Sequence, residues 1–234
     1  MSYYCKPSGE YALSGTEWTN NVQQYYAYMQ NYTTLNNIVG QLCNVQAESG
    51  MNPWRWQGDT YGLSRGYGLY QYTPASSYVN LTGIPGHAPN LSTSGVVGGN
   101  ESDANAQIYV FANNSLSKWH SSCWRSYWDP STYPSQYAKH TYILNTYGNG
   151  STLTLGQFFT IDNYEDACFA FLACFEGPAV PNYSARLGYA TAIYTALNEP
   201  IPPTPPIPPT PPSPGEVEEM FVVSILMERN RRNR

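Results

Sequence analysis

Residues 46–54 read QAESGMNPW, and they end a stretch that has the apolar period of a helix. Apolar side chains recur three or four positions apart over residues 34–45, which predicts a helix that continues into this stretch. Ser49-Gly50 supplies a stop signal, because glycine adopts the left-handed conformation in which many helices end. The sequence therefore predicts Glu48 in the last helical turn, where the negative end of the helix dipole disfavours a charged carboxylate.

Two tryptophans, Trp54 and Trp56, follow Glu48 closely, and their indole rings would exclude water from a nearby carboxyl group. Burial and the helix dipole both favour the protonated form of a carboxyl group. A general acid that works near neutral pH needs this form. The pattern therefore indicates Glu48 as a proton donor; the alternative is a solvated surface residue, which a lone glutamate at a helix end usually is.

A second motif follows at residues 65–78, which read RGYGLYQYTPASSY. Small and large residues alternate here before Thr73-Pro74, a typical helix start. Glycines in such a stretch let a ligand approach the backbone closely. The amide of Gln71 can both donate and accept hydrogen bonds, as sugar hydroxyls and N-acetyl groups require. We expect a short β-hairpin with Gln71 as a substrate-binding residue; an ordinary hairpin with a structural glutamine is the alternative.

Together the two motifs resemble the active-site frame of lysozyme-like enzymes. Residues 39–81 look like the lysozyme domain of tail-tip peptidoglycan hydrolases that short-tailed phages of Gram-positive hosts carry. The resemblance resumes at residues 171–194, where this family has an aromatic-Glu-x-Pro-Ala segment before its last helix and the chain reads FEGPA. It implies a mainly α, lysozyme-like fold of the α+β type, in which the short β-hairpin lies next to the active-site cleft.

The resemblance also implies roles for individual residues. Glu48 would donate a proton to the glycosidic oxygen, and Asp59 would be the second carboxylate, which stabilises the oxocarbenium-like transition state or activates water. The alternative for Asp59 is a loop-tip residue in an Asx turn. Glu176 either lines the cleft or is a structural residue that pairs with Arg186 or caps backbone groups. The candidates for stacking on sugar rings, with core packing as the alternative, are Tyr70, Tyr72, Trp54 and Trp56.

The composition favours an uncharged ligand that is rich in hydroxyl groups. Aromatic residues make up 15% of the 234 residues and charged residues only 12%, so the surface depends on neutral polar side chains. The net charge of −5 argues against nucleic acid as the main partner, because no basic stripe is there to neutralise phosphates. The same charge is mild evidence against a polyanionic substrate such as peptidoglycan that carries teichoic acid.

Cysteine and histidine patterns predict neither a metal site nor a cofactor. The five cysteines include no C-x-x-C pair, and the three histidines form no H-x-H or H-E-x-x-H motif. We expect buried free thiols. A cysteine amidase or peptidase with Cys43 as nucleophile and His87 or His140 as base is a rival hypothesis. Cys43 falls inside the expected helix, however, and not at a helix N-terminus, where a thiol is activated.

A proline-rich stretch at residues 199–216, EPIPPTPPIPPTPPSPGE, divides the chain. Proline restricts its own backbone and that of the residue before it, which predicts a semi-rigid polyproline II spacer. We therefore expect a glycoside hydrolase domain at residues 1–198, a linker at residues 199–215 and a docking segment at residues 216–234. The docking segment is expected to bind tail-knob or tail-tube proteins, and its apolar run is too short for a membrane span.

By this resemblance the chain is a phage tail-associated muramidase that cleaves the glycan strands of host peptidoglycan and opens the wall for DNA ejection. We expect it in the virion, at the tail tip, because the chain opens without the basic and apolar regions of a signal peptide. Two alternatives stay open: a non-catalytic glycan-binding or tail-plug protein with a lysozyme-like fold, and a lysis endolysin. Hydrolysis and lytic transglycosylation are both compatible with one essential glutamate.

Overall fold

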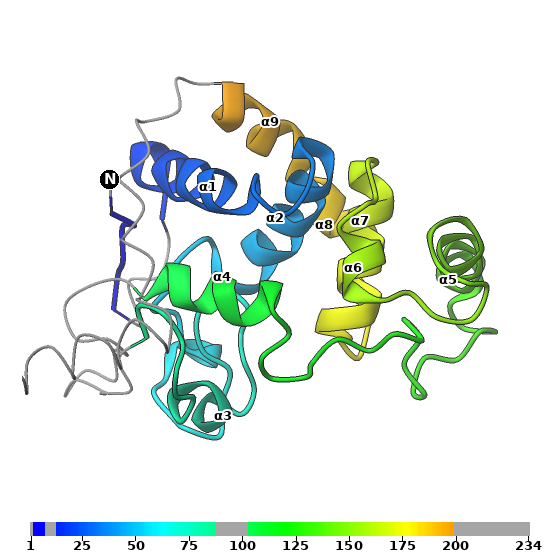
Figure 1. Cartoon of the computed structure of the whole chain (residues 1–234), viewed down its shortest axis with the longest axis horizontal. Coiled ribbons are helices and arrows are strands. Elements are labelled where there is room, and N and C mark those ends of the chain that lie inside the picture. The colour runs from blue at the N-terminus through cyan, green and yellow to red at the C-terminus, as the bar shows by residue number, and fades with distance from the viewer. Residues whose placement is uncertain (1, 8–12, 88–102, 199–234) are drawn as a thin grey trace, which may run out of the picture. The chain divides into compact units, whose positions relative to one another are not determined.

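The structure is a computed structural model, and it describes residues 2–7, 13–87 and 103–198. The regular structure of this part of the chain is almost entirely helical (Figure 1). In chain order the elements are α1 (Gly15–Met29), α2 (Leu35–Ser49), the 3-10 turn η1 (Gln57–Asp59), α3 (Ala75–Val79), α4 (Ala104–Ala112), α5 (Pro134–Tyr147), α6 (Leu155–Phe158), α7 (Tyr164–Phe171), the π-helical turn η2 (Leu172–Glu176), α8 (Tyr183–Leu187) and α9 (Ala190–Asn198).

Helix α2 is the centre of the domain, and it contacts α1, α7, α8 and α9. The side chain of Thr34 accepts a hydrogen bond from the backbone of Asn37 at its start, and Gly50 ends it with a left-handed φ of 60°. Gly40 faces α7 so closely that a Cβ there would lie 2.6 Å from the backbone nitrogen of Cys168. Glycine therefore lets α2 and α7 approach each other backbone to backbone, and α5 packs against α7 (Figure 1).

Buried amide side chains tie α2 to its neighbours. Asn37 donates to the carbonyl of Phe158 at 2.7 Å, and Asn44 donates to the carbonyl of Cys168 at 3.1 Å. The hydroxyl group of Tyr25 on α1 donates to Gln41 at 2.7 Å. Because a buried polar group is costly unless it is hydrogen-bonded, these contacts fix how α2 packs on its neighbours. They hold the last turn of α2, and Glu48 with it, in one place.

The mainly helical, lysozyme-like class is confirmed, but the structure does not show the β-hairpin predicted in the segment before Thr73-Pro74. Two isolated antiparallel bridges join Tyr67 to Trp56 and to Tyr72. Backbone φ is positive at Gly68 (80°) and at Gln71 (44°), so the chain turns before a second strand can extend. Residues 65–74 of the motif form a compact loop, and residues 75–78 belong to α3, which begins just after Thr73-Pro74 as predicted.

The apolar pattern also predicts a helix from Asp162, as its N-cap, to about Phe175, and another over residues 184–197. The observed helices differ from both in detail. The N-cap of α7 is Asn163, whose side chain accepts from two backbone N–H groups, and not Asp162. The predicted helix at residues 184–197 is broken between α8 and α9, around Gly188. The prediction of free thiols is wrong for Cys123 and Cys174, which form a disulfide. The prediction of buried free thiols holds for Cys43 and Cys168.

The predicted linker and docking segment, residues 199–234, lie outside the described residues. Within the described part of the chain, none of the helices has both the length and the apolar character of a membrane span. No group of three or more side chains suited to metal binding occurs in that same part.

Candidate active site

Glu48 lies in the last turn of α2, as predicted, and it faces a cation. The Nη2 atom of Arg186, on α8, lies 2.5 Å from Oε1 of Glu48. Both side chains are largely buried, with 22% of Glu48 and 9% of Arg186 exposed. Arg186 also donates from Nη1 to the side chain of Asn44 at 3.2 Å, which orients the guanidinium group. A close cation favours the charged form of a carboxylate, whereas the sequence predicted surroundings that favour the protonated form.

Glu176 is the second carboxyl group of this site, and it ends the π-helical turn η2. Its Oε1 atom is buried and has no hydrogen-bond partner within the described part of the protein. Burial raises the pKa of Glu176 well above its ordinary value, and the charge of Glu48 raises it further. Three cations act against this rise: Arg186, Lys118 and Arg125. The charge of Glu48 thus acts on a glutamate whose motif lies far from it in the sequence.

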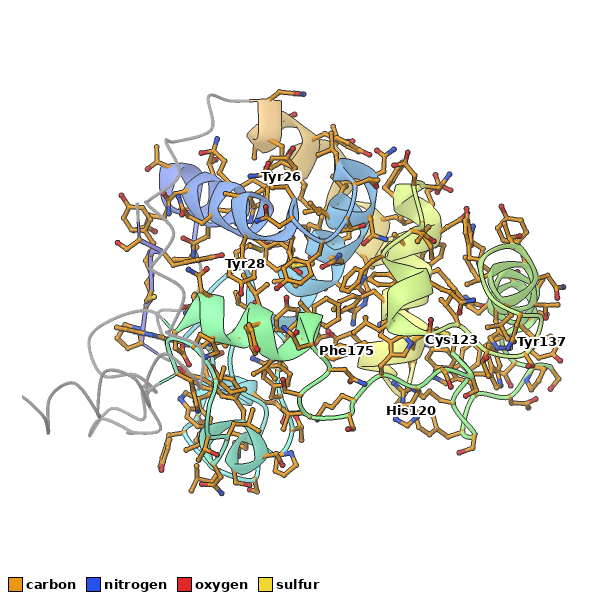
Figure 2. The ribbon with its side chains drawn as sticks, in the orientation of Figure 1. Tyr26, Tyr28, His120, Cys123, Tyr137 and Phe175 are labelled. Atoms are coloured by element: carbon orange, nitrogen blue, oxygen red, sulfur yellow. A yellow bond between two sulfur atoms is a disulfide. The ribbon has the colours of Figure 1, made fainter. Side chains whose placement is uncertain are left out.

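A long connection between α4 and α5 holds the end of η2 in place. Figure 2 shows His120 and Cys123 of this connection beside Phe175. Cys123 forms the disulfide with Cys174. Four further hydrogen bonds join the two segments. The backbone N–H of His120 donates to the carbonyl of Cys174, and the side chain of Arg125 donates to that of Phe175. The side chains of Tyr127 and Trp128 donate to the carbonyls of Gly177 and Pro178. Glu176 is therefore fixed from both sides.

The backbone around Glu176 departs from an ordinary α-helix. The N–H group of Gly177 donates to the carbonyl of Leu172 at 2.7 Å, a π-type bond that spans five residues. Gly177 has a φ of 53°, and a Cβ at this position would lie 2.1 Å from Nε of Arg125. A side chain there would meet both backbone strain and Arg125. Single π-helical turns are rare and often occur at functional sites.

Asp59, the predicted second carboxylate, lies in the loop after α2. It ends η1 with a φ of 53°, and its Oδ1 atom lies 3.5 Å from Nε of Arg55. This ion pair joins two residues of the same loop. The catalytic role of Asp59 stays a prediction.

Gln71 shapes the loop that carries it. Its Nε2 atom donates to the backbone carbonyls of Arg55, at 3.1 Å, and Gly68, at 2.9 Å. Both hydrogens of the amide are therefore used within the protein, while the carbonyl oxygen can still accept a bond. Substrate binding by Gln71 stays a prediction, now restricted to its acceptor oxygen.

The four aromatic candidates for sugar stacking occupy different environments. Trp56, Tyr70 and Tyr72 are at most 2% exposed. The hydroxyl group of Tyr70 bonds to that of Tyr25 at 2.9 Å, and the hydroxyl group of Tyr72 donates to the backbone of Gln107 at 2.8 Å. Their rings are covered by protein, so stacking by these three stays a prediction that would require the rings to become uncovered. Trp54 alone among the four keeps partial exposure.

The sequence interpretation missed the cations of the site. Arg186 was considered only as a partner of Glu176, and it pairs with Glu48 instead. Lys118 and Arg125 come from the connection between α4 and α5, which carries no motif that marks them. Lys118 donates to the backbone carbonyl of Thr73, just after the second motif. The one marker near Lys118 and Arg125 is Cys123, and a basic residue a few positions from a cysteine is too common a pattern to identify a site residue.

A mainly helical domain with a partly buried glutamate at the end of its central helix fits the lysozyme-like class of proteins. The chain belongs to the phage tail lysozyme family, which matches residues 19–197. Over 74 residues it is 45% identical to Morphogenesis protein 1 of Bacillus phage B103, an alignment that spans 29% of this chain and 19% of that relative. The resemblance to phage tail lysozyme domains is thus confirmed. The chain is a lysozyme-like protein of the phage tail.

Proposed function

We propose that the chain is a muramidase that hydrolyses the β-1,4 bond between N-acetylmuramic acid and N-acetylglucosamine in host peptidoglycan. The observation that carries the proposal is the position of Glu48. It lies in the last turn of α2, partly buried and held by Arg186, within a domain of the phage tail lysozyme family. Glycoside hydrolysis needs a carboxyl group that donates a proton to the leaving oxygen, usually together with a second carboxylate.

Glu48 serves as the proton donor to the glycosidic oxygen in this proposal. General acid catalysis of this kind contributes about 10²- to 10⁴-fold to a rate. Asp59 remains the candidate that stabilises the transition state or activates water from the loop after α2. Trp54 and Gln71 are the candidates for sugar contacts, because Trp54 is partly exposed and both amide hydrogens of Gln71 are bonded to the backbone, which leaves its side-chain oxygen without a donor among the described residues.

The decisive experiment compares the wild-type chain with Glu48→Gln on purified peptidoglycan, with mass spectrometry of the products. We expect Glu48→Gln to lose at least about 100-fold in activity. Glu165→Gln is the matched control, because Glu165 is an exposed glutamate on α7, and it should keep wild-type activity. Equal activity of wild type and Glu48→Gln would contradict the mechanism. Anhydro-muramic ends would assign the chain to the lytic transglycosylases, and a wild-type chain that binds glycan without cutting it would be a non-catalytic tail protein.

We propose further that the enzyme acts from the virion tail tip during genome ejection, and that residues 216–234 attach it to tail-knob or tail-tube proteins. The similarity to a phage morphogenesis protein supports this location. Mass spectrometry of purified particles should find the chain. Particles that lack it, together with release of the chain at lysis, would instead indicate an endolysin.

A further inference from the structure

Asn44 and Glu48 lie one helical turn apart on the same face of α2, and Arg186 of α8 bridges them. The Nη1 atom of Arg186 lies 3.2 Å from the side-chain oxygen of Asn44, and its Nη2 atom lies 2.5 Å from Oε1 of Glu48. A guanidinium group is planar and presents its donors in a fixed geometry. One rigid group therefore contacts the candidate proton donor and a second point on the same helix.

Asn44 is itself fixed by the fold. Its side chain is buried, and Nδ2 donates to the backbone carbonyls of Gly40, at 3.0 Å, and Cys168, at 3.1 Å. Both amide hydrogens are then in use, so the side-chain oxygen is free to accept from Arg186. Helix α8, which carries Arg186, packs on both α2 and α7. The backbone of α2 and α7 thus sets the position of the guanidinium group that reaches Glu48.

The contact with Arg186 makes the two oxygens of Glu48 unequal. Oε1 accepts from Nη2 of Arg186, whereas Oε2 accepts no hydrogen bond from the described residues. An N–H group can only donate, so the oxygen that it faces must act as an acceptor whether the carboxyl group is charged or neutral. A proton on Glu48 is therefore carried by Oε2. The contact with a cation is in this way compatible with a proton donor, because it occupies the oxygen that does not react.

We propose that Arg186 is a positioning residue that fixes the carboxyl group of Glu48 through Oε1 and leaves Oε2 to donate the proton to the glycosidic oxygen. The inference rests on the proposed function and adds the residue that orients its proton donor. Arg186 acts through Glu48 and touches no substrate atom.

The proton balance of this step is simple. As the glycosidic bond breaks, the proton moves from Oε2 of Glu48 to the leaving oxygen. The carboxylate that remains is paired with Arg186, which favours the charged form by a charge-assisted hydrogen bond. The water that completes the hydrolysis gives its hydroxide to the sugar and its proton to Glu48.

The alternative is a purely structural ion pair, and the burial of Arg186 argues against it. Only 9% of this side chain is exposed, and its Nε atom is buried without a hydrogen-bond partner among the described residues. Transfer of an ion pair out of water costs free energy that the contact often does not return, and apolar side chains in its place are often equally stable. An unsatisfied buried donor adds to this cost. The effect of Arg186 on Glu48 therefore explains the arginine better than stability does.

The test measures kcat and KM separately for wild type and Arg186→Lys on soluble peptidoglycan fragments, with folding checked by circular dichroism. Lysine keeps the charge but lacks the planar set of donors that reaches Asn44 and Glu48 together. We expect kcat to fall by about 10- to 100-fold, because a small misplacement of a reacting group is costly, while KM stays within about twofold of wild type. Glu17→Gln, in the partly exposed pair with Lys6, is the control and should keep both constants.

Asn44→Ala tests the same series of contacts without a change of charge. It removes the oxygen that accepts from Nη1 of Arg186 and leaves the contact between Arg186 and Glu48 available. We expect a smaller fall in kcat, about 3- to 10-fold, again with little change in KM. This variant also decides the matter if Arg186→Lys does not fold.

A double-mutant cycle separates positioning from a general effect on the fold. Arg186→Lys is combined with Glu48→Gln, and the residual activity of the double variant is compared with that of Glu48→Gln alone. If Arg186 acts through Glu48, the lysine substitution should change this residual activity by less than about twofold. Asn44→Ala should behave in the same way in the Glu48→Gln background.

Three results would each overturn the inference. They are a wild-type kcat in both Arg186→Lys and Asn44→Ala, a raised KM at unchanged kcat, which would make Arg186 a substrate-binding residue, and an equal loss with and without Glu48, which would make its role structural. Full activity of Glu48→Gln would instead refute the proposed function itself, so the two failures are distinguishable.

Discussion

Cys123 and Cys174 form a disulfide that fastens the connection between α4 and α5 to the turn that ends at Glu176. The two cysteines are separated by 51 positions, so the bond closes a long loop of the unfolded chain. It also lies two residues before Glu176, which couples the stability of the fold to the geometry of the site.

Removal of this disulfide should destabilise the protein. We expect a Cys123→Ser, Cys174→Ser double variant to lose about 4 kcal/mol in free energy of unfolding, from the loop entropy that the bond removes. Denaturant unfolding with and without a reductant measures the effect. The reductant should lower the stability of wild type and leave the double variant unchanged; a wild type that is indifferent to reductant would contradict the role assigned to the bond.

Loss of Arg186 should be costly because it leaves Glu48 as a largely buried, unpaired charge. Removing one partner of a buried ion pair destabilises a protein by about 3 kcal/mol or more, and we expect Arg186→Ala to reach this range. Glu17→Gln is the matched control, because the Lys6–Glu17 ion pair is about one-third exposed. Such surface pairs contribute about 1 kcal/mol or less. Equal losses in urea unfolding of the two variants would show that burial does not govern the Arg186 contact.

The substitution Gly40→Ala has two opposing effects on stability, one from helix propensity and one from packing against α7. Alanine is favoured over glycine inside a helix by about 1 kcal/mol. At Gly40 the new Cβ would meet backbone atoms of α7 at 2.6 and 2.7 Å, and overpacking of this kind costs about 1–3 kcal/mol. We expect a net loss of stability, measured as a lower melting temperature.

Gly156→Ala is the control for this comparison, since the nearest atom to a Cβ at Gly156 in α6 is 3.9 Å away. It should leave the melting temperature unchanged or raise it slightly. A Gly40→Ala protein as stable as wild type would mean that α2 and α7 can separate without penalty.

Asp103 should make stability depend on pH. Burial raises the pKa of Asp103 to about 7, although Tyr78 and Gln107 donate hydrogen bonds to its carboxyl group and oppose the rise. A carboxyl pKa that is raised by folding means that the folded state holds the proton more tightly than the unfolded state. The contribution of Asp103 to the free energy of unfolding is therefore complete below about pH 4 and is lost as the pH rises through about 7. The free energy of unfolding falls by about 4 kcal/mol over this range. Glu176 acts in the same direction.

The measurement is denaturant unfolding of wild type and Asp103→Asn between pH 4 and pH 8. Asparagine cannot ionise, so the variant should lose less stability than wild type across this range. Parallel curves for the two proteins would rule out Asp103 as a source of the pH dependence.

The local features of the site could be predicted from the sequence because they depend on neighbouring residues. The apolar period before Glu48 and the glycine after it predicted where α2 ends, and Gly50 adopts the left-handed conformation expected of it. The predicted β-hairpin failed because alternation of small and large residues does not reveal a positive φ at Gln71. The break between α8 and α9 at Gly188 was also missed, because the apolar residues of the helical pattern continue on one face across it.

The sequence by itself determined the family, the helical class and the position of Glu48 at a helix end, because each follows from short-range pattern. Only the tertiary structure decided what surrounds that glutamate. Arg186 comes from α8, Glu176 from η2, and Lys118 and Arg125 from a connection without a motif. These charges interact because α7 and α8 both pack on α2, and η2 continues α7. Electrostatic interaction depends on distance in space and on burial, and neither can be read from the order of the residues.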